Sequence, residues 1–290
     1  MLPKRTLLGA ALAATLASSA SAALIAYEGF DYSESVGTSI TGLNGGTGWD
    51  EAFPAPGGGT LLLANGLGYS GTNALATVGK SVNFAGNSNM STGRDWADST
   101  SAVASGTYYY SFQIDPVAAA RGTLIIMKTT GSADGQNGFG IRLDNNAGNP
   151  QFKAWSPHQA GGANIDFAGG YGSTYFVVGK ITIVQGGTST NSISVFNSTG
   201  TIPLTEPAFA SSVSRAWVDA TGTATQGDTL RTTLSGRAFS NNTGYRIDEI
   251  RIGETYADVA SAIPEPSSFA ALAGLGALGF IATRRRQQAK

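Results

Sequence analysis

The chain has 290 residues, of which 40 are glycine, one is histidine and none is cysteine, and 13% are charged, against about 25% in ordinary soluble domains. This composition excludes a disulfide framework, a cysteine nucleophile and any metal centre built on several histidines. Residues 23–261 carry 12 basic and 18 acidic residues, and this negative balance argues against nucleic acid or anionic lipid as a partner.

The N-terminus has the pattern of a secretory signal peptide. Lys4 and Arg5 precede an apolar run over 7–17, and Ala20 and Ala22 supply the small residues of an A-x-A cleavage site. The alternative is an uncleaved membrane anchor, but the apolar run is too short for one, because a spanning helix needs about 20 residues. We therefore expect export by the Sec machinery and cleavage after Ala22 by signal peptidase.

Residues 23–261 have the pattern of one all-β domain. Short runs of β-branched and aromatic residues alternate with polar residues, and no apolar period of 3.6 residues persists. Alternation predicts five apolar strand faces: Tyr108, Tyr110, Phe112 and Ile114; Leu124 and Ile126; Tyr175, Val177, Ile181 and Ile183; Ile193 and Val195; and Ile250 and Ile252. In the last of these strands, Asp248 is expected on the same face as Ile250 and Ile252. Ile247, Glu249 and Arg251 are expected on the opposite face.

The turns between these runs are spaced as in hairpins. Asn137-Gly138 and Gly186-Gly187 are two examples. We expect an antiparallel two-sheet sandwich that is stabilised by packing alone, since cysteine is absent. A parallel β-helix is the alternative, but no short fixed period is present.

Four sequence blocks occur in order along the domain. They are AYEGFDY at 26–32, LNGGTGW at 43–49, YFVVGKI at 175–181 and IDEIRIG at 247–253. Together they are similar to a group of exported bacterial proteins whose core resembles the concanavalin A-like, laminin-G-like jelly roll. The resemblance implies two packed antiparallel sheets of about a dozen strands, with the first and last strands adjacent. Proteins of this fold bind glycans, proteins or calcium, or cleave polysaccharides, so the fold leaves the function open.

Glycoside cleavage requires a pair of carboxyl groups about 5 Å or more apart. The E-x-D-x-x-E spacing of glycosidases of this fold class does not occur. Asp248 and Glu249 are adjacent and point to opposite faces of a regular strand, while Asp95 and Asp98 stand in a segment expected to be a loop. His158, next to Pro157, is expected to be exposed in a loop. We assign no catalytic residue and expect a protein that is not an enzyme.

Oxygen ligands for calcium are available in two turn segments, 134–137 and 144–149. Neither has the spacing of an EF-hand loop, and Asx-Gly turns occur in many hairpins. We assign no metal ligand and no cofactor, and calcium binding remains open.

Sugar binding commonly uses an aromatic ring beside polar side chains. The chain has four tryptophans, and we expect two or three of them to be packed in the core. Trp96, which stands between acidic residues, and Trp155, in a polar glycine-rich segment, are the two that we assign to ligand binding.

The C-terminus combines a short motif, an apolar stretch and a basic cluster. Pro264, Glu265 and Pro266 precede the apolar residues 269–282, which end before Arg284, Arg285 and Arg286. At 14 residues the stretch is short for a spanning helix, and a buried core helix is the alternative. A stretch without a polar face that ends in three arginines favours a membrane helix with its arginines in the cytoplasm.

This tail resembles the PEP-CTERM sorting signal of Gram-negative bacteria. The resemblance covers 262–290 and implies that exosortase, a membrane cysteine transpeptidase, recognises Pro264, Glu265 and Pro266. It also implies that the arginines are stop-transfer charges and that export is linked to exopolysaccharide. The inner membrane then holds the chain before processing.

The predicted organisation is a signal peptide (1–22), a β-sandwich (23–261) and a sorting tail (262–290). We expect a non-enzymatic protein of the cell surface or extracellular matrix that associates with exopolysaccharide. The alternatives are a polysaccharide-active hydrolase whose carboxylates come from separate strands, and a protein-binding adhesion module.

Overall fold

The computed structural model describes residues 24–56, 59–85, 89–97, 105–116, 121–129, 138–146, 149–156, 161–167, 170–184, 186–216, 230–237 and 245–260. The predicted signal peptide (1–22) and sorting tail (262–290), with the apolar stretch 269–282, lie outside these residues. Within them, no helix is both long and apolar enough to cross a membrane.

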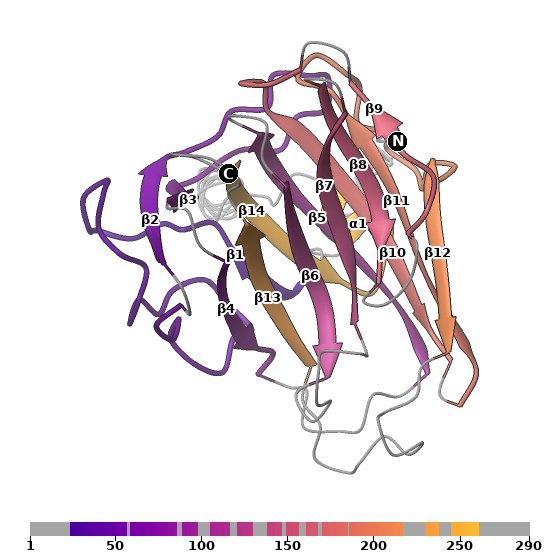
Figure 1. The fold of residues 1–290 in the computed structure, drawn as a ribbon, viewed down its shortest axis with the longest axis horizontal. Coiled ribbons are helices and arrows are strands. Elements are labelled where there is room, and N and C mark those ends of the chain that lie inside the picture. The colour runs from indigo at the N-terminus through magenta and orange to yellow at the C-terminus, as the bar shows by residue number, and fades with distance from the viewer. Residues whose placement is uncertain are drawn as a thin grey trace, which may run out of the picture.

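The described residues form strands and one short helix (Figure 1). The elements are β1 (Leu24–Glu28), β2 (Thr60–Asn65), β3 (Lys80–Ala85), β4 (Asn89–Asp95), β5 (Gly106–Pro116), β6 (Arg121–Thr129), β7 (Gly138–Asn146), β8 (Asn149–Trp155), β9 (Ile165–Asp166), β10 (Tyr175–Ile183), β11 (Thr188–Phe196), β12 (Ser211–Ala216), β13 (Leu230–Arg237), β14 (Tyr245–Gly253) and α1 (Tyr256–Ala260).

The strands form two sheets. An eight-stranded sheet has the order β12-β11-β10-β5-β14-β3-β2, with β1 also paired to β14, and a six-stranded sheet has the order β4-β13-β6-β7-β8-β9. Each recorded pairing is antiparallel. The prediction of an all-β, two-sheet antiparallel jelly-roll sandwich is confirmed, and so is the expected adjacency of the first and last strands, β1 and β14.

The main hydrophobic core lies between the two sheets. The predicted alternation in β5 is confirmed, because Tyr110, Phe112 and Ile114 are at most 1% exposed and belong to this core. The predicted faces of β6, β10 and β11 also point into it. Complete burial of an aromatic or branched aliphatic side chain contributes about 1.5–3 kcal/mol, so this layer stabilises the sandwich without disulfides.

The predicted common face of Ile250 and Ile252 in β14 is confirmed. The predicted sides of Ile247 and Asp248 are wrong, because the strand contains a bulge. Its register with β5 shifts between Asp248 and Arg251, and Glu249 has a φ of 54°. The extra residue keeps Ile247 and Ile250 on the same, core-facing side. Asp248, Glu249 and Arg251 therefore share the outer side of the sheet, whereas regular alternation placed Asp248 with Ile250.

The glycines of the 43–49 block allow it to lie directly on β1. Thr47 and Tyr27 exchange two backbone hydrogen bonds of 2.9 Å. Gly48 has a φ of 76°, and a Cβ at this position would lie 1.9 Å from the carbonyl oxygen of Ile25. Glycine is required here because it accepts a positive φ and leaves room for the neighbouring backbone.

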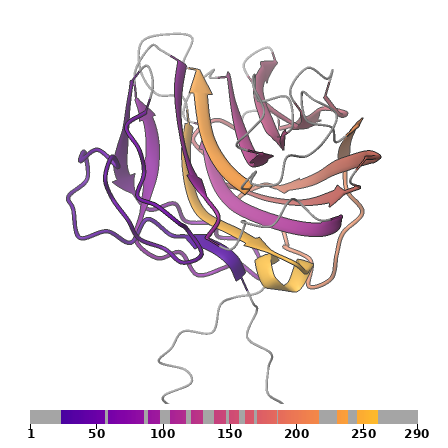
Figure 2. The ribbon, with the colours of Figure 1, turned by 90° about the horizontal axis from the view of Figure 1, so that it is seen from below.

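A second hydrophobic cluster covers the outer face of the eight-stranded sheet. It joins Tyr109 of β5 and Phe176 of β10 to Tyr256 and Val259 of α1. Figure 2 shows α1 on one side of the curved eight-stranded sheet and the six-stranded sheet on the other. The helix is an addition to the predicted strands, and it ends the described domain at Ala260.

Candidate functional site

The outer face of the six-stranded sheet carries a polar group of side chains beside a tryptophan. On β8, Phe152 and Ala154 point into the core, so Lys153 and Trp155 lie on the outer face. On β7, Ile141 and Leu143 are in the core, which places Arg142 and Asp144 on the same outer face. We call Arg142, Asp144, Gln151, Lys153 and Trp155 the outer-face cluster.

Asp144 is the centre of this cluster. Its Oδ2 lies 2.9 Å from Arg142 Nε and 2.9 Å from Lys153 Nζ. Burial raises the pKa of Asp144, but the hydrogen bonds from Lys153 and Arg142 outweigh this effect and hold the pKa below its usual range. One carboxylate thus fixes two cations, and Arg142 contacts it through Nε.

Trp155 is half-buried and pairs in register with Gly140 of β7. Because glycine has no side chain, the neighbouring position on this face of β7 is bare. Gln151, in turn, donates a 2.5 Å hydrogen bond from Nε2 to Asp166 Oδ1 on β9. This face of the sheet therefore brings together an aromatic ring, the Arg142 side chain, which is 39% exposed, and the Lys153 side chain, which is 14% exposed. Groups of these kinds stack on and hydrogen-bond sugars.

Trp96, the other tryptophan assigned to ligand binding, lies in the core. It is 3% exposed, and its indole N–H donates a 2.9 Å hydrogen bond to Thr232 Oγ1. Its ring also packs edge-on against Tyr108. Because both ring faces are enclosed by protein, we correct the assignment of Trp96 as a stacking platform. Trp49 is half-buried, with its indole N–H bonded to the backbone of Tyr27, and Trp217 lies outside the described residues.

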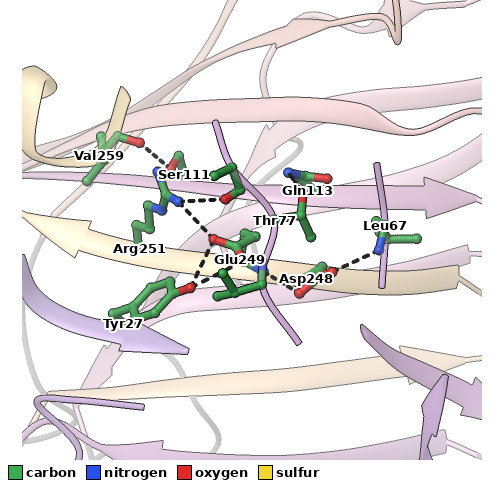
Figure 3. A network of polar contacts seen from close by, with 11 residues as sticks. Tyr27, Leu67, Thr77, Ser111, Gln113, Asp248, Glu249, Arg251 and Val259 are labelled. Atoms are coloured by element: carbon green, nitrogen blue, oxygen red, sulfur yellow. Dashed lines mark hydrogen bonds and ion pairs between the residues drawn. The ribbon is translucent and has the colours of Figure 1, made fainter. Parts of the chain in front are cut away.

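Asp248 and Glu249 come together on one side of the sheet, contrary to the prediction from strand alternation. Both are at most 1% exposed. Asp248 Oδ2 accepts the backbone N–H of Leu67 at 2.9 Å (Figure 3). Glu249 Oε1 accepts the backbone N–H of Val78 at 2.8 Å. The two carboxyl groups thus anchor the segment 66–78 over β14.

Further groups complete this buried network. Tyr27 donates its hydroxyl to Glu249 at 3.1 Å, and Arg251 donates to Glu249 Oε2 at 2.8 Å (Figure 3). Burial raises the pKa of Tyr27, and the charge of Glu249 adds to this shift. These hydrogen bonds join three segments, so the role of the network in this structure is to hold β1, β14 and the 66–78 segment together.

The remaining predicted sites are only partly described. Asp95 ends β4, and its carbonyl oxygen accepts the N–H of Asp50, while Asp98, His158 and the segment 134–137 lie outside the described residues. In the 144–149 segment, Asp144 is bound by two cationic side chains instead of facing an open loop. The part of the chain that the structure describes contains no group of three or more acidic, histidine or cysteine residues suited to a metal ion.

Comparison with known families identifies the tail. Residues 262–286 match the family model of the PEP-CTERM protein-sorting motif. The chain therefore carries a PEP-CTERM sorting signal. This confirms the resemblance seen in the sequence, including its place at the end of the chain. The motif is the recognition signal of exosortase, and it marks an exported protein that is anchored in a membrane before processing.

Comparison with solved structures adds only distant likenesses. The chain is similar to lectin II from Ulex europaeus, with 10% identity and a TM-score of 0.37 over 73% of this chain and 95% of the lectin. It is also similar to the globular domain of T. cruzi calreticulin, with 11% identity and a TM-score of 0.41 over 70% of this chain and 82% of that domain. A protein of unknown function from Shewanella oneidensis is similar with 16% identity and a TM-score of 0.42 over 80% of this chain and 87% of that protein. No curated protein matches the sequence. The fold therefore rests on the sheet topology, and the ligand must be argued from the site.

Proposed function

We propose that this protein is delivered to the surface or extracellular matrix of a Gram-negative bacterium, where it associates with exopolysaccharide without cleaving it. The PEP-CTERM motif at 262–286 carries the first half of the proposal. The outer-face cluster carries the second half, because Trp155, Arg142 and Lys153 lie together on one side of the six-stranded sheet.

The chemistry of the cluster fits a carbohydrate. An indole ring offers a flat apolar surface to the C–H face of a pyranose, while guanidinium and ammonium groups donate hydrogen bonds to hydroxyl or carboxylate oxygens. Asp144 holds both cations in place before the ligand arrives, and this reduces the entropy lost on binding.

The sorting step is tested by replacing Pro264, Glu265 and Pro266 with alanine. In a host that contains an exosortase, we expect the unchanged protein to lose the residues that follow the motif, and the variant to retain its tail in the inner membrane. Intact mass and cell fractionation measure both. Full-length tails on both proteins would contradict sorting through this motif and leave a simple C-terminal anchor.

The binding step is tested with Trp155→Ala and Arg142→Ala. We expect each variant to bind the host's exopolysaccharide about tenfold more weakly or worse, because buried Trp and Arg contacts contribute about 2 kcal/mol in binding sites. Affinity electrophoresis in gels containing the polysaccharide measures the change. The matched control is Leu204→Ala, which removes an exposed apolar side chain from the opposite side of the sandwich.

Two results would contradict the binding proposal. If Trp155→Ala migrates like the unchanged protein while circular dichroism shows both folded, the outer-face cluster is not the binding site. Release of reducing ends from the polysaccharide would show that the protein cleaves it.

A further inference from the structure

Helix α1 is fixed tightly to the outer side of the eight-stranded sheet. Ser111 Oγ donates a 2.6 Å hydrogen bond to the carbonyl oxygen of Val259, and Tyr256 Oη donates one of 2.6 Å to that of Pro203. Gly253 permits this packing, because a Cβ there would lie 2.5 Å from the Cβ of Asp258. Ala260, the last described residue, is 6% exposed, so the chain leaves the domain from a fixed point.

The beginning of the described chain lies at the same place. Leu24 pairs with Gly253 and packs against the cluster that contains Tyr256 and Ala260. Figure 2 shows the start of β1 next to α1. Leu204 follows Pro203, the hydrogen-bond partner of Tyr256, and is 79% exposed. We call this end of the domain, which contains the exposed Leu204, the partly buried Leu24 and the buried Tyr256 and Ala260, the α1 pole.

The length of chain after α1 limits how far the domain stands from a membrane. Nine Cα–Cα steps separate Ala260 from Phe269, where the apolar stretch begins. At full extension they span about 30 Å, which is less than the length of about 36 Å of an 11-residue strand such as β5. The point of exit therefore stays close to the bilayer for as long as the stretch is inserted.

We propose that the α1 pole is the surface of the domain that faces the lipid of the inner membrane in the anchored precursor. This inference rests on the proposed sorting function, because it needs the apolar stretch to be inserted. The outer-face cluster lies on the other sheet of the sandwich and therefore points away from the membrane. The precursor can then bind polysaccharide before exosortase releases it.

The charges of the α1 pole indicate that the tail, not attraction to lipid, creates this contact. Glu254 is exposed, and Glu206 is paired with Lys180 at 2.9 Å. The pole therefore presents no excess of positive charge to an anionic bilayer. An exposed leucine at this position is compatible with the lipid interface, whereas a cluster of exposed acidic residues would be repelled.

The absence of cysteine from the chain allows a direct test. Leu204→Cys places one thiol at the α1 pole, and Thr123→Cys places one on the outer face of the six-stranded sheet, in register with Arg142. Each full-length variant is labelled with the same fluorophore and reconstituted into phosphatidylcholine–phosphatidylglycerol vesicles that carry a nitroxide on the lipid headgroup. We expect strong quenching of the probe at 204 and weak quenching of the probe at 123.

The outcomes separate the orientation from the function on which it depends. Equal quenching at both positions, stronger quenching at 123, or none at either would overturn the orientation, while polysaccharide binding and motif-dependent processing could still be observed. Flotation of the vesicles checks insertion independently. Protein that fails to float with the vesicles would overturn both the anchored precursor and its orientation.

Discussion

Arg94→Ala should lower the free energy of unfolding by about 3–5 kcal/mol, the usual effect of removing one partner from a buried ion pair. Arg94 and Glu28 are 2% and 1% exposed, and Arg94 Nη1 lies 2.8 Å from Glu28 Oε2. Burial raises the pKa of Glu28, and the charge of Arg94 opposes this shift. Without Arg94, Glu28 must either take up a proton or remain charged in the core, and both states destabilise the fold.

Arg94 also holds the segment that follows β1. Its Nε donates to the carbonyl oxygen of Glu51 at 2.5 Å, and its Nη2 donates to Asn44 Oδ1 at 2.6 Å. The guanidinium carbon lies 4.9 Å from the ring centroid of Phe53. Since one side chain joins β1, β4 and the 44–53 segment, we expect its loss to increase hydrogen exchange in that segment as well.

Urea unfolding followed by circular dichroism measures the effect of Arg94→Ala. The matched control is Arg142→Ala, which breaks an ion pair whose arginine side chain is 39% exposed and should cost at most about 1 kcal/mol. The double variant Glu28→Gln with Arg94→Met should recover part of the loss, because no uncompensated charge remains. A loss below about 1 kcal/mol for Arg94→Ala would show that water reaches Glu28.

The sequence was informative where a local pattern determines the structure. Alternation from Tyr108 to Ile114 predicted the core face of β5 because a regular strand has a period of two residues. The tail was recognised because its motif, apolar stretch and arginines are contiguous. Trp155 was placed in a polar, glycine-rich segment, and the structure adds that it shares a sheet face with Arg142 and Lys153.

The predictions that failed depend on residues far apart in the chain. Regular alternation misplaced Asp248 because a one-residue bulge changes the phase of β14. Trp96 was assigned to ligand binding in a segment expected to be a loop, yet its hydrogen-bond partner Thr232 is 136 residues away. The ion pair of Glu28 with Arg94 spans 66 residues, and no local signal connects the two.

The stability of the domain should fall as the pH rises from about 5 to about 8. Burial, together with the nearby charge of Glu249, raises the pKa of Asp248 to about 9, whereas an aspartate in the unfolded chain ionises near pH 4. In this range the folded state keeps a proton that the unfolded state has lost. Unfolding therefore releases close to one proton, and the free energy of unfolding decreases by up to about 1.4 kcal/mol per pH unit.

Urea unfolding at pH 5, 6, 7 and 8 measures this slope, and Asp248→Asn is the control. Asparagine does not titrate, so the variant should release about one proton fewer on unfolding. Its free energy of unfolding should therefore decrease less steeply with pH, whatever its absolute stability. The comparison is needed because Glu28, whose pKa is also raised by burial, contributes a slope of the same sign. Equal slopes in the two proteins would mean that Asp248 is ionised in the folded state, stabilised by the N–H groups of Leu67 and Glu249. A smaller slope in the variant would instead identify Asp248 as a buried neutral acid that ties the 66–78 segment to β14.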